Sequence, residues 1–343
     1  MHGFLRKHHI LFAVFLLTAA CSPPVSQPEP TAGKALRIDG ANVLALAREM
    51  INIGPRPSGS EGAAKTAEWI VEKLEQQGFS AKIQAWREKT PRGSMTFRNV
   101  ILTSPGKKAG RIILGSHYDT KRLPQYPQFI GANDSGSSTA LLLALIPKLA
   151  KLPKEERCTL EFVFFDGEEC IEEYSDNDGL HGSRYYARLI GDRNEIKKYR
   201  AMILLDMIGD RDLHITIPRE TPGHLAQILF AVAKEQNVRP QFGYMLRGSI
   251  MDDHVPFARL GIPSINLIDF EYGPDNRYWH TPEDTLDKLS GASLETVGNV
   301  VAERCHGECG RSPNGQFAAH WSFEKKRQYN DKNGHAYKKG RQF

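Results

Sequence analysis

The segment 159–170, TLEFVFFDGEEC, limits the fold of this 343-residue chain more than any other stretch. Residues 160–165 form a mainly apolar, aromatic and β-branched run, which contains one charged residue, Glu161, and is typical of a strand buried in a sheet. The following DGEE ends the strand and places Glu168 and Glu169 side by side. Ligands of open α/β sheets bind beyond the carboxyl ends of strands, but DGEE also suits a solvated surface turn.

The two adjacent carboxylates need an explanation of their own. Glu168 and Glu169 repel each other unless a positive charge lies between them or one of them keeps its proton. A metal ion held by one carboxylate, with the other left to carry protons, meets both conditions. The partners of this pair elsewhere in the chain therefore decide between a site and a turn.

Apolar strands alternate with helical segments along the chain, which predicts one α/β sheet covered by helices on both faces. A helix is expected between Ser60, a suitable N-cap, and Gly78. The other expected helices are 39–52, 139–150, 182–189, 222–235 and 282–303, and the expected strands are 80–86, 95–103, 111–116, 160–165, 201–205 and 262–268.

Both ends of the chain differ from the predicted domain at 38–305. Residues 1–20 combine a basic start with a short apolar stretch, which is typical of a signal peptide. Cys21 follows small residues as in a bacterial lipoprotein signal, although Thr18 stands where an aliphatic residue is usual, so ordinary secretory cleavage stays open. The Pro-rich segment 21–37 indicates a tether. Either interpretation predicts export to the cell envelope or periplasm.

The formal net charge of +5 is unevenly distributed. Basic residues are concentrated in 306–343, a segment without apolar periodicity, for which we expect a solvated, disordered tail. Without this tail and the basic start of the chain, the remainder is mildly acidic. A mildly acidic domain gives no reason to expect a nucleic-acid partner.

Acids and histidines lie just past predicted strands or at loop–helix junctions. Nitrogen and carboxylate ligands suit zinc, and a catalytic zinc takes three protein ligands with an open fourth position. Each residue alone has an ordinary alternative, such as a helix N-cap or a turn acid. Together, beside the acid pair, they predict a metal site at the rim of the sheet, and they are His117, Asp134, Glu169, Asp206 and His280.

Short motifs connect these residues. They are HYDTK at 117–121, GAND at 131–134, DGEE at 166–169, GLHGSR at 179–184, DDHVPF at 252–257 and WHT at 279–281. Their order resembles the M28 zinc peptidase superfamily and, within it, the glutaminyl cyclases (glutaminyl-peptide cyclotransferases). The resemblance covers roughly 38–301. It implies a single α/β domain of the zinc aminopeptidase type, with a mixed, mostly parallel central sheet and helices on both faces.

The resemblance also implies a role for each matching residue. One zinc ion would be held by Asp134, Glu169 and His280. The other implied site residues are Glu168 as general acid/base, Asp206 and Asp252 in the catalytic hydrogen-bond network, and Trp279, Tyr174 and Asn266 in the substrate pocket. Tyr174 stands where the animal cyclases have Trp, and Asn266 where they have His. These departures bear on the substrate more than on the zinc site.

The reaction implied is the cyclisation of N-terminal glutamine in peptides or proteins to pyroglutamate, with release of ammonia. Zinc would polarise the side-chain carbonyl, and Glu168 would carry a proton from the attacking α-amine to the departing ammonia. The enzyme would mainly fold one substrate side chain back on itself. We expect a monomer whose partners are such peptides, with membrane contact through a lipid anchor at Cys21.

A two-zinc aminopeptidase is the alternative enzyme. His117 and Asp206 would hold a second metal, Asp134 would bridge the pair, and Glu168 would activate water. All of these residues are present, so ligand identity alone does not separate the two activities. A binding protein of the same fold without activity would be expected to lack Glu168 or a ligand, and neither is missing.

Overall fold

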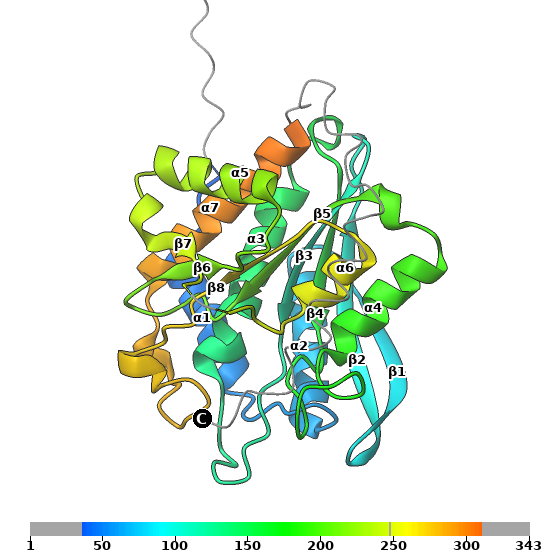
Figure 1. Cartoon of the computed structure of the whole chain (residues 1–343), viewed down its shortest axis with the longest axis vertical. Coiled ribbons are helices and arrows are strands. Elements are labelled where there is room, and N and C mark those ends of the chain that lie inside the picture. Colours follow the sequence, from blue (N-terminus) through cyan, green and yellow to red (C-terminus); the bar gives the residue numbers. More distant parts are fainter. Residues whose placement is uncertain (1–35, 247, 311–343) are drawn as a thin grey trace, which may run out of the picture. The chain divides into compact units, whose positions relative to one another are not determined.

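Residues 36–246 and 248–310 are described by a computed structural model (Figure 1). The signal peptide expected at 1–20, the lipidated Cys21, the tether up to residue 35 and the tail beyond residue 310 lie outside these ranges, so they stay predictions. Within the described ranges, no helix has both the length and the apolar character needed to cross a bilayer.

The eight strands found in the described residues belong to one sheet with the order β1-β2-β4-β3-β5-β8-β6-β7. The parallel pairs are β3–β4, β3–β5, β5–β8 and β6–β7, and the antiparallel pairs are β1–β2, β2–β4 and β6–β8. The predicted mixed, mostly parallel sheet is confirmed. The strands are β1 (Lys82–Thr90), β2 (Gly93–Ser104), β3 (Arg111–His117), β4 (Thr159–Phe165), β5 (Tyr199–Asp206), β6 (Ile215–Ile217), β7 (Phe242–Tyr244) and β8 (Ser264–Ile268).

Helices cover both faces of this sheet, as predicted (Figure 1). Successive side chains of a strand point to opposite faces, so Ile112 and Leu114 of β3 lie in the core under α1, α2, α3, α5 and α7, whereas Ile113 packs under α4 and α6. The helices are α1 (Gly40–Ile51), α2 (Glu61–Gln76), α3 (Ser138–Ala150), α4 (His181–Asp192), α5 (Gly223–Glu235), α6 (His254–Leu260) and α7 (Gly291–Gly310).

Two predicted helix starts are confirmed by their caps. The side chain of Asp39 accepts hydrogen bonds from the backbone of Ala41 and Asn42 at the start of α1, and Ser60 accepts one from Ala63 at the start of α2.

The last helix, predicted at 282–303, was placed wrongly. It begins at Gly291, after a short 3-10 helix at Leu286–Lys288, and it ends at Gly310. The preceding residues form a turn instead, in which the buried Asp284 accepts hydrogen bonds from the backbone of Asn133 and Asp134. These long-range hydrogen bonds stabilise the turn against the helix that the local pattern predicts.

The site lies where the central parallel strands end. β3 ends at His117, β4 runs directly into the DGEE turn, and β5 ends at Asp206. His117 pairs with Phe165 in the register of β3 and β4, so the strand ends are level. Because carboxyl ends of parallel strands meet at one edge, residues far apart in sequence come together there.

We predict a pH effect on stability from His254, the first residue of α6. It is buried, neither ring nitrogen has a hydrogen-bond partner among residues 36–246 and 248–310, and burial lowers its pKa to about 3. Below pH ~6.5, His254 binds a proton in the unfolded chain but stays neutral in the folded chain. The free energy of unfolding therefore falls as the pH drops. His254→Phe should therefore lose about 2 kcal/mol less between pH 7 and pH 5 than the wild type.

Urea unfolding of both proteins at the two pH values measures this difference, and the other titrating groups cancel in the comparison. Equal losses in the two proteins would contradict the assignment to His254.

Candidate metal centre and active site

Asp134, Glu169 and His280 converge at the rim of the sheet. Asp134 lies in the turn η1 (Ala132–Ser137) before α3, Glu169 follows β4, and His280 lies in the loop between β8 and α7. His280 Nε2 lies 2.8 Å from Glu169 Oε1 and 3.2 Å from Asp134 Oδ2. One donor atom from each residue lies within 4.8 Å of the others. Two carboxylates and one imidazole at this spacing form a donor set that suits zinc.

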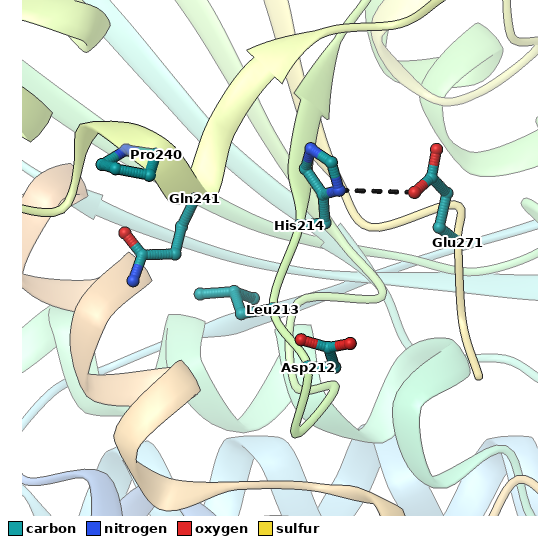
Figure 2. A pocket seen from close by; sticks show the side chains of 6 residues that line it. All are labelled: Asp212, Leu213, His214, Pro240, Gln241 and Glu271. Carbon is teal, nitrogen blue, oxygen red and sulfur yellow. Dashed lines mark ion pairs between the residues drawn. The ribbon is translucent and has the colours of Figure 1, made fainter. Parts of the chain in front are cut away.

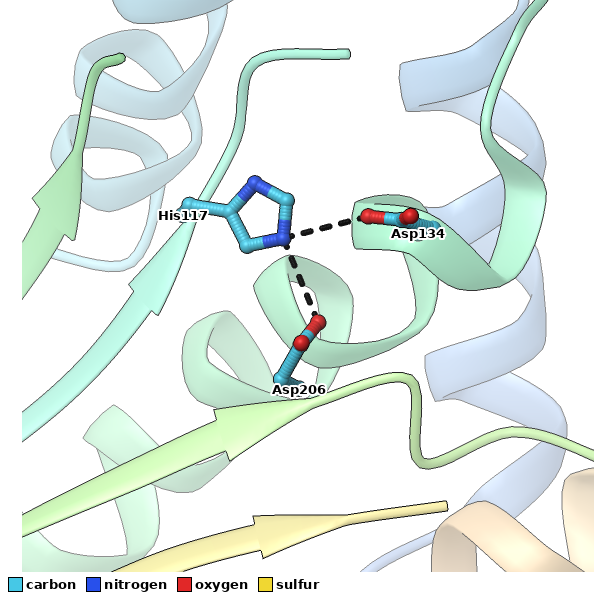
Figure 3. Close-up of side chains that lie close together, drawn as sticks. All are labelled: His117, Asp134 and Asp206. Atoms are coloured by element: carbon cyan, nitrogen blue, oxygen red, sulfur yellow. Dashed lines mark hydrogen bonds and ion pairs between the residues drawn. The ribbon is translucent and has the colours of Figure 1, made fainter. Parts of the chain in front are cut away.

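A second cluster shares Asp134 with the first (Figure 3). His117 Nε2 lies 3.3 Å from Asp134 Oδ1 and 3.2 Å from Asp206 Oδ1, and all three residues are buried. Burial raises the pKa of Asp206, an effect that its contact with His117 opposes. Asp134 thus presents one oxygen to each cluster. A carboxylate that bridges two cation sites would be placed in this way.

Opposite charges keep the two candidate carboxylate ligands ionised. Burial opposes the charge of Asp134, but contacts with His117 and His280 outweigh it and lower the pKa of that carboxyl. Against burial, the charge of Glu169 and the contact with Asp134 raise the pKa of His280 to about 10. The Lys121 ammonium, 3.2 Å from Glu169 Oε2, joins His280 in lowering the pKa of Glu169. Ionised carboxylates and a neutral imidazole are the forms that bind metal ions, so His280 would release a proton when a metal binds.

Glu168 belongs to neither cluster. Its Oε1 accepts a hydrogen bond of 3.0 Å from the hydroxyl of Tyr174. Burial and the charge of Glu169 raise the pKa of Glu168 well above its usual range, and the nearby charge of Asp252 adds to this effect. Asp252 is itself buried, and its Oδ2 accepts a hydrogen bond of 2.5 Å from Asn266 Nδ2. A carboxylate with a raised pKa suits proton transfer near neutral pH.

Trp279 forms an aromatic wall beside the first cluster. Its ring stacks on His280 with 4.1 Å between centroids and meets Phe270 edge-on at 5.0 Å. Phe129 approaches the His280 ring edge-on at 6.2 Å. These contacts fix the imidazole plane, and they leave Trp279 only partly buried.

Asp119 holds the turn that carries the acid pair. Its carboxylate accepts hydrogen bonds from the backbone N–H of Glu168, at 3.1 Å, and of Glu169, at 3.3 Å. The Ser58 hydroxyl lies 3.2 Å from Asp119 and 3.1 Å from Asp166, where burial and the charge of Asp119 raise the Asp166 pKa to about 7. The sequence placed Asp119 in a motif but suggested no role for it.

Asp284 supports the other ligand-bearing turn. Its carboxylate accepts hydrogen bonds from the backbone N–H of Asn133, at 2.7 Å, and of Asp134, at 3.2 Å, and from the hydroxyl of Tyr272, at 2.8 Å. Burial raises the pKa of Asp284 to about 7. Sequence analysis missed this residue, because its contacts lie about 150 positions away along the chain.

One cavity, of about 310 Å³, borders the site through Phe129 and Asp284, which contact His280 and the backbone of Asp134. Another, of about 230 Å³, is lined by Asp212, Leu213, His214, Pro240, Gln241 and Glu271, whose side chains are drawn in Figure 2. His214 and Glu271 form an ion pair of 3.3 Å there, but their side chains are 53% and 57% exposed, so solvent screens it. No candidate metal ligand lines this cavity. The candidate site is therefore the charged rim of the sheet.

Residues 99–304 match the family model for peptidase family M28. The glutaminyl-peptide cyclotransferase of Drosophila melanogaster is 28% identical over 270 residues, which cover 72% of this chain and 75% of that protein. The crystal structure of an Acidobacteriales bacterium glutaminyl cyclase aligns with a TM-score of 0.75 at 34% identity and covers 83% of this chain and 99% of that one.

A leucine aminopeptidase precursor from Bacteroides thetaiotaomicron VPI-5482 has the same fold, with a TM-score of 0.68 at 23% identity over 79% of this chain and 97% of that one. The sheet and its rim of acids and histidines thus define an aminopeptidase-like fold with a candidate metal centre. The chain belongs to peptidase family M28 and, within that family, to the glutaminyl cyclases.

We predict that Asp284→Asn weakens zinc binding by about tenfold to a hundredfold, because residues that orient ligands typically contribute this much to metal affinity. The amide keeps one acceptor oxygen and loses the other, so the backbone at Asn133 and Asp134 is held less firmly. Competition with a chromophoric chelator measures the affinity.

Asp287→Asn is the matched control, because Asp287 is close in sequence but its side chain is 69% exposed. Equal zinc affinities for the two variants would contradict a supporting role for Asp284.

Proposed function

We propose that this protein cyclises N-terminal glutamine residues of peptides and proteins to pyroglutamate and releases ammonia. The observation that carries the proposal is the division of the acid pair. Glu169 faces Asp134 and His280, whereas Glu168 lies outside the clusters with a raised pKa. The likeness to a glutaminyl-peptide cyclotransferase and a glutaminyl cyclase supports this reaction over other M28 chemistry.

We propose one zinc ion per chain, held by Asp134, Glu169 and His280. The donor set and the ionised state of the carboxylates support this assignment. When bound, zinc supplies a Lewis acid for the side-chain carbonyl of the substrate. His117 and Asp206 would then act within the protein, by holding the second oxygen of Asp134.

Glu168 moves the proton in this proposal. It accepts a proton from the substrate α-amine as the bond between the α-nitrogen and the side-chain carbonyl carbon forms. It returns that proton to the side-chain nitrogen as the bond from the same carbon to this nitrogen breaks, and ammonia leaves. The raised pKa makes Glu168 a stronger base than a carboxylate in water. Asp252 adds to the raised pKa of Glu168, and burial raises the pKa of Asp252 as well.

The substrate side chain must fold back on itself before it reacts, and an enzyme gains most by holding that conformation. Trp279 provides a rigid aromatic face beside His280 for this purpose. Tyr174 and Asn266 complete the proposed pocket, in contact with Glu168 and Asp252 respectively.

An aminopeptidase with two metal ions is the second candidate, and the cluster of His117, Asp134 and Asp206 favours it. Glu168 would then take a proton from water.

We also propose that the enzyme acts outside the cytoplasm as a monomer anchored by lipid at Cys21. The location and the lipid anchor rest on the sequence of the N-terminal segment alone.

Glu168→Gln should lower turnover at least about a hundredfold, because the amide cannot accept the proton. Zinc content should stay at the wild-type value, since Glu168 is outside both clusters. Turnover is measured by ammonia release and zinc by atomic absorption. Near-wild-type turnover in this variant would remove Glu168 from its role.

The two candidate functions differ in their products. We expect ammonia release from a peptide that begins with glutamine, and no free leucine from a matched peptide that begins with leucine. Metal analysis of the same preparation should return one zinc per chain. Two zinc ions together with leucine release would favour the aminopeptidase.

A further inference from the structure

The loop between β4 and α4 is built to hold Tyr174 in one position. Asp178, itself buried, accepts hydrogen bonds from three successive backbone N–H groups, those of Ile171 at 2.7 Å, Glu172 at 2.8 Å and Glu173 at 3.1 Å. These bonds close the loop immediately before Tyr174. A carboxylate that accepts three charge-assisted hydrogen bonds makes this part of the loop rigid, and Tyr174 follows directly.

The ring of Tyr174 is fixed from two sides. Gly179 has a φ of +80°, and a Cβ at that position would lie only 2.5 Å from the tyrosine ring, so the ring packs directly on glycine backbone. The Lys121 ammonium lies 5.3 Å from the ring centroid, within the range of a cation–π contact. One part of the ring stays open to solvent, because Tyr174 is 39% exposed.

The Tyr174 hydroxyl points to the proton carrier and not to solvent. It donates to Glu168 Oε1 at 3.0 Å. In residues 36–246 and 248–310, no other side chain donates a hydrogen bond to that carboxylate. The backbone of Glu168 is already held by Asp119, so the Tyr174 hydroxyl fixes the one part of the residue that could still rotate.

We infer that Tyr174 is a positioning residue for Glu168: its hydroxyl holds Oε1 and leaves Oε2 directed at the reacting group. The inference deepens the proposed function and rests on Glu168 being the proton carrier. A tyrosine that served only as an aromatic wall for the substrate would need its ring and not its hydroxyl. The two roles therefore predict different effects of removing the hydroxyl alone.

The test is Tyr174→Phe, assayed on whichever of the glutamine and leucine peptides the wild type turns over. We expect kcat to fall about tenfold, the loss of one hydrogen bond to a charged group, with KM within about twofold of the wild type. Zinc content and melting temperature should not change. Tyr126→Phe is the matched control, because Tyr126 is also 39% exposed, and its kcat should equal the wild-type value.

A second variant tests whether the Tyr174 hydroxyl affects kcat through Glu168. Glu168→Asp keeps a base but withdraws the carboxylate from the hydroxyl by one methylene. Adding Tyr174→Phe to this variant should change kcat by less than about twofold, because the contact is already lost. A wild-type kcat for Tyr174→Phe, a rise in KM alone, or the same tenfold loss in the Glu168→Asp background would each overturn the inference.

This design separates the inference from the proposed function. If the wild type hydrolyses the leucine peptide and leaves the glutamine peptide intact, the cyclase proposal fails, yet the same kcat comparison still tests Tyr174, since Glu168 transfers the proton in either reaction. If the wild type releases ammonia and Tyr174→Phe has the same kcat, the proposed function is supported and the positioning role of Tyr174 is refuted.

Discussion

Asp134 is a buried carboxylate with a separate partner for each of its oxygens. His280 lies 3.2 Å from one and His117 lies 3.3 Å from the other. A buried charge is costly unless it is paired, and Asp134 also lies close to the carboxylates of Glu169 and Asp206. Without the two imidazoles, or a cation in their vicinity, so many acids could not remain ionised at one edge of the sheet. The other residues of the site surround these paired carboxylates and imidazoles.

Hydrogen bonds to backbone amides and carbonyls hold the charged side chains and their loops in place. Asp119 accepts the N–H groups of the turn that carries Glu168 and Glu169, and Asp284 accepts those of the turn that carries Asp134. Arg56 is fully buried, and its guanidinium donates to four backbone carbonyls, those of Gly54, Tyr118, Ile130 and Gly131. The charged side chains around the site thus stabilise loops as well as one another, which explains how loop residues can keep a defined geometry.

Two residues of the proposed pocket each make a polar contact with an acid of the proposed catalytic network. Tyr174 reaches Glu168, and Asn266 reaches Asp252. A tryptophan at the first position would keep an aromatic face but place its donor elsewhere on the ring. Both contacts therefore bear on how these acids are oriented and involve none of the three candidate ligands of the first cluster.

Local chemistry was enough to predict most of the strands and helices, the two-faced sheet and the residues at the strand ends, but it missed the short helix α6. Buried parallel strands read as continuous apolar runs, and their carboxyl ends must meet at one edge, so His117, Glu169 and Asp206 could be expected together from the sequence. The short edge strand β7, three residues long, carried too little pattern to be found.

Only the tertiary structure decided what supports these residues. The contact from Asp284 to Asn133 spans 151 positions, and the contact from Asp119 to Glu168 spans 49. No local period or motif spacing encodes such a pairing, because it depends on how loops from different strands pack. For the same reason the helix predicted from residue 282 gave way to a turn, and Tyr174 proved to contact Glu168 as well as to offer an aromatic face.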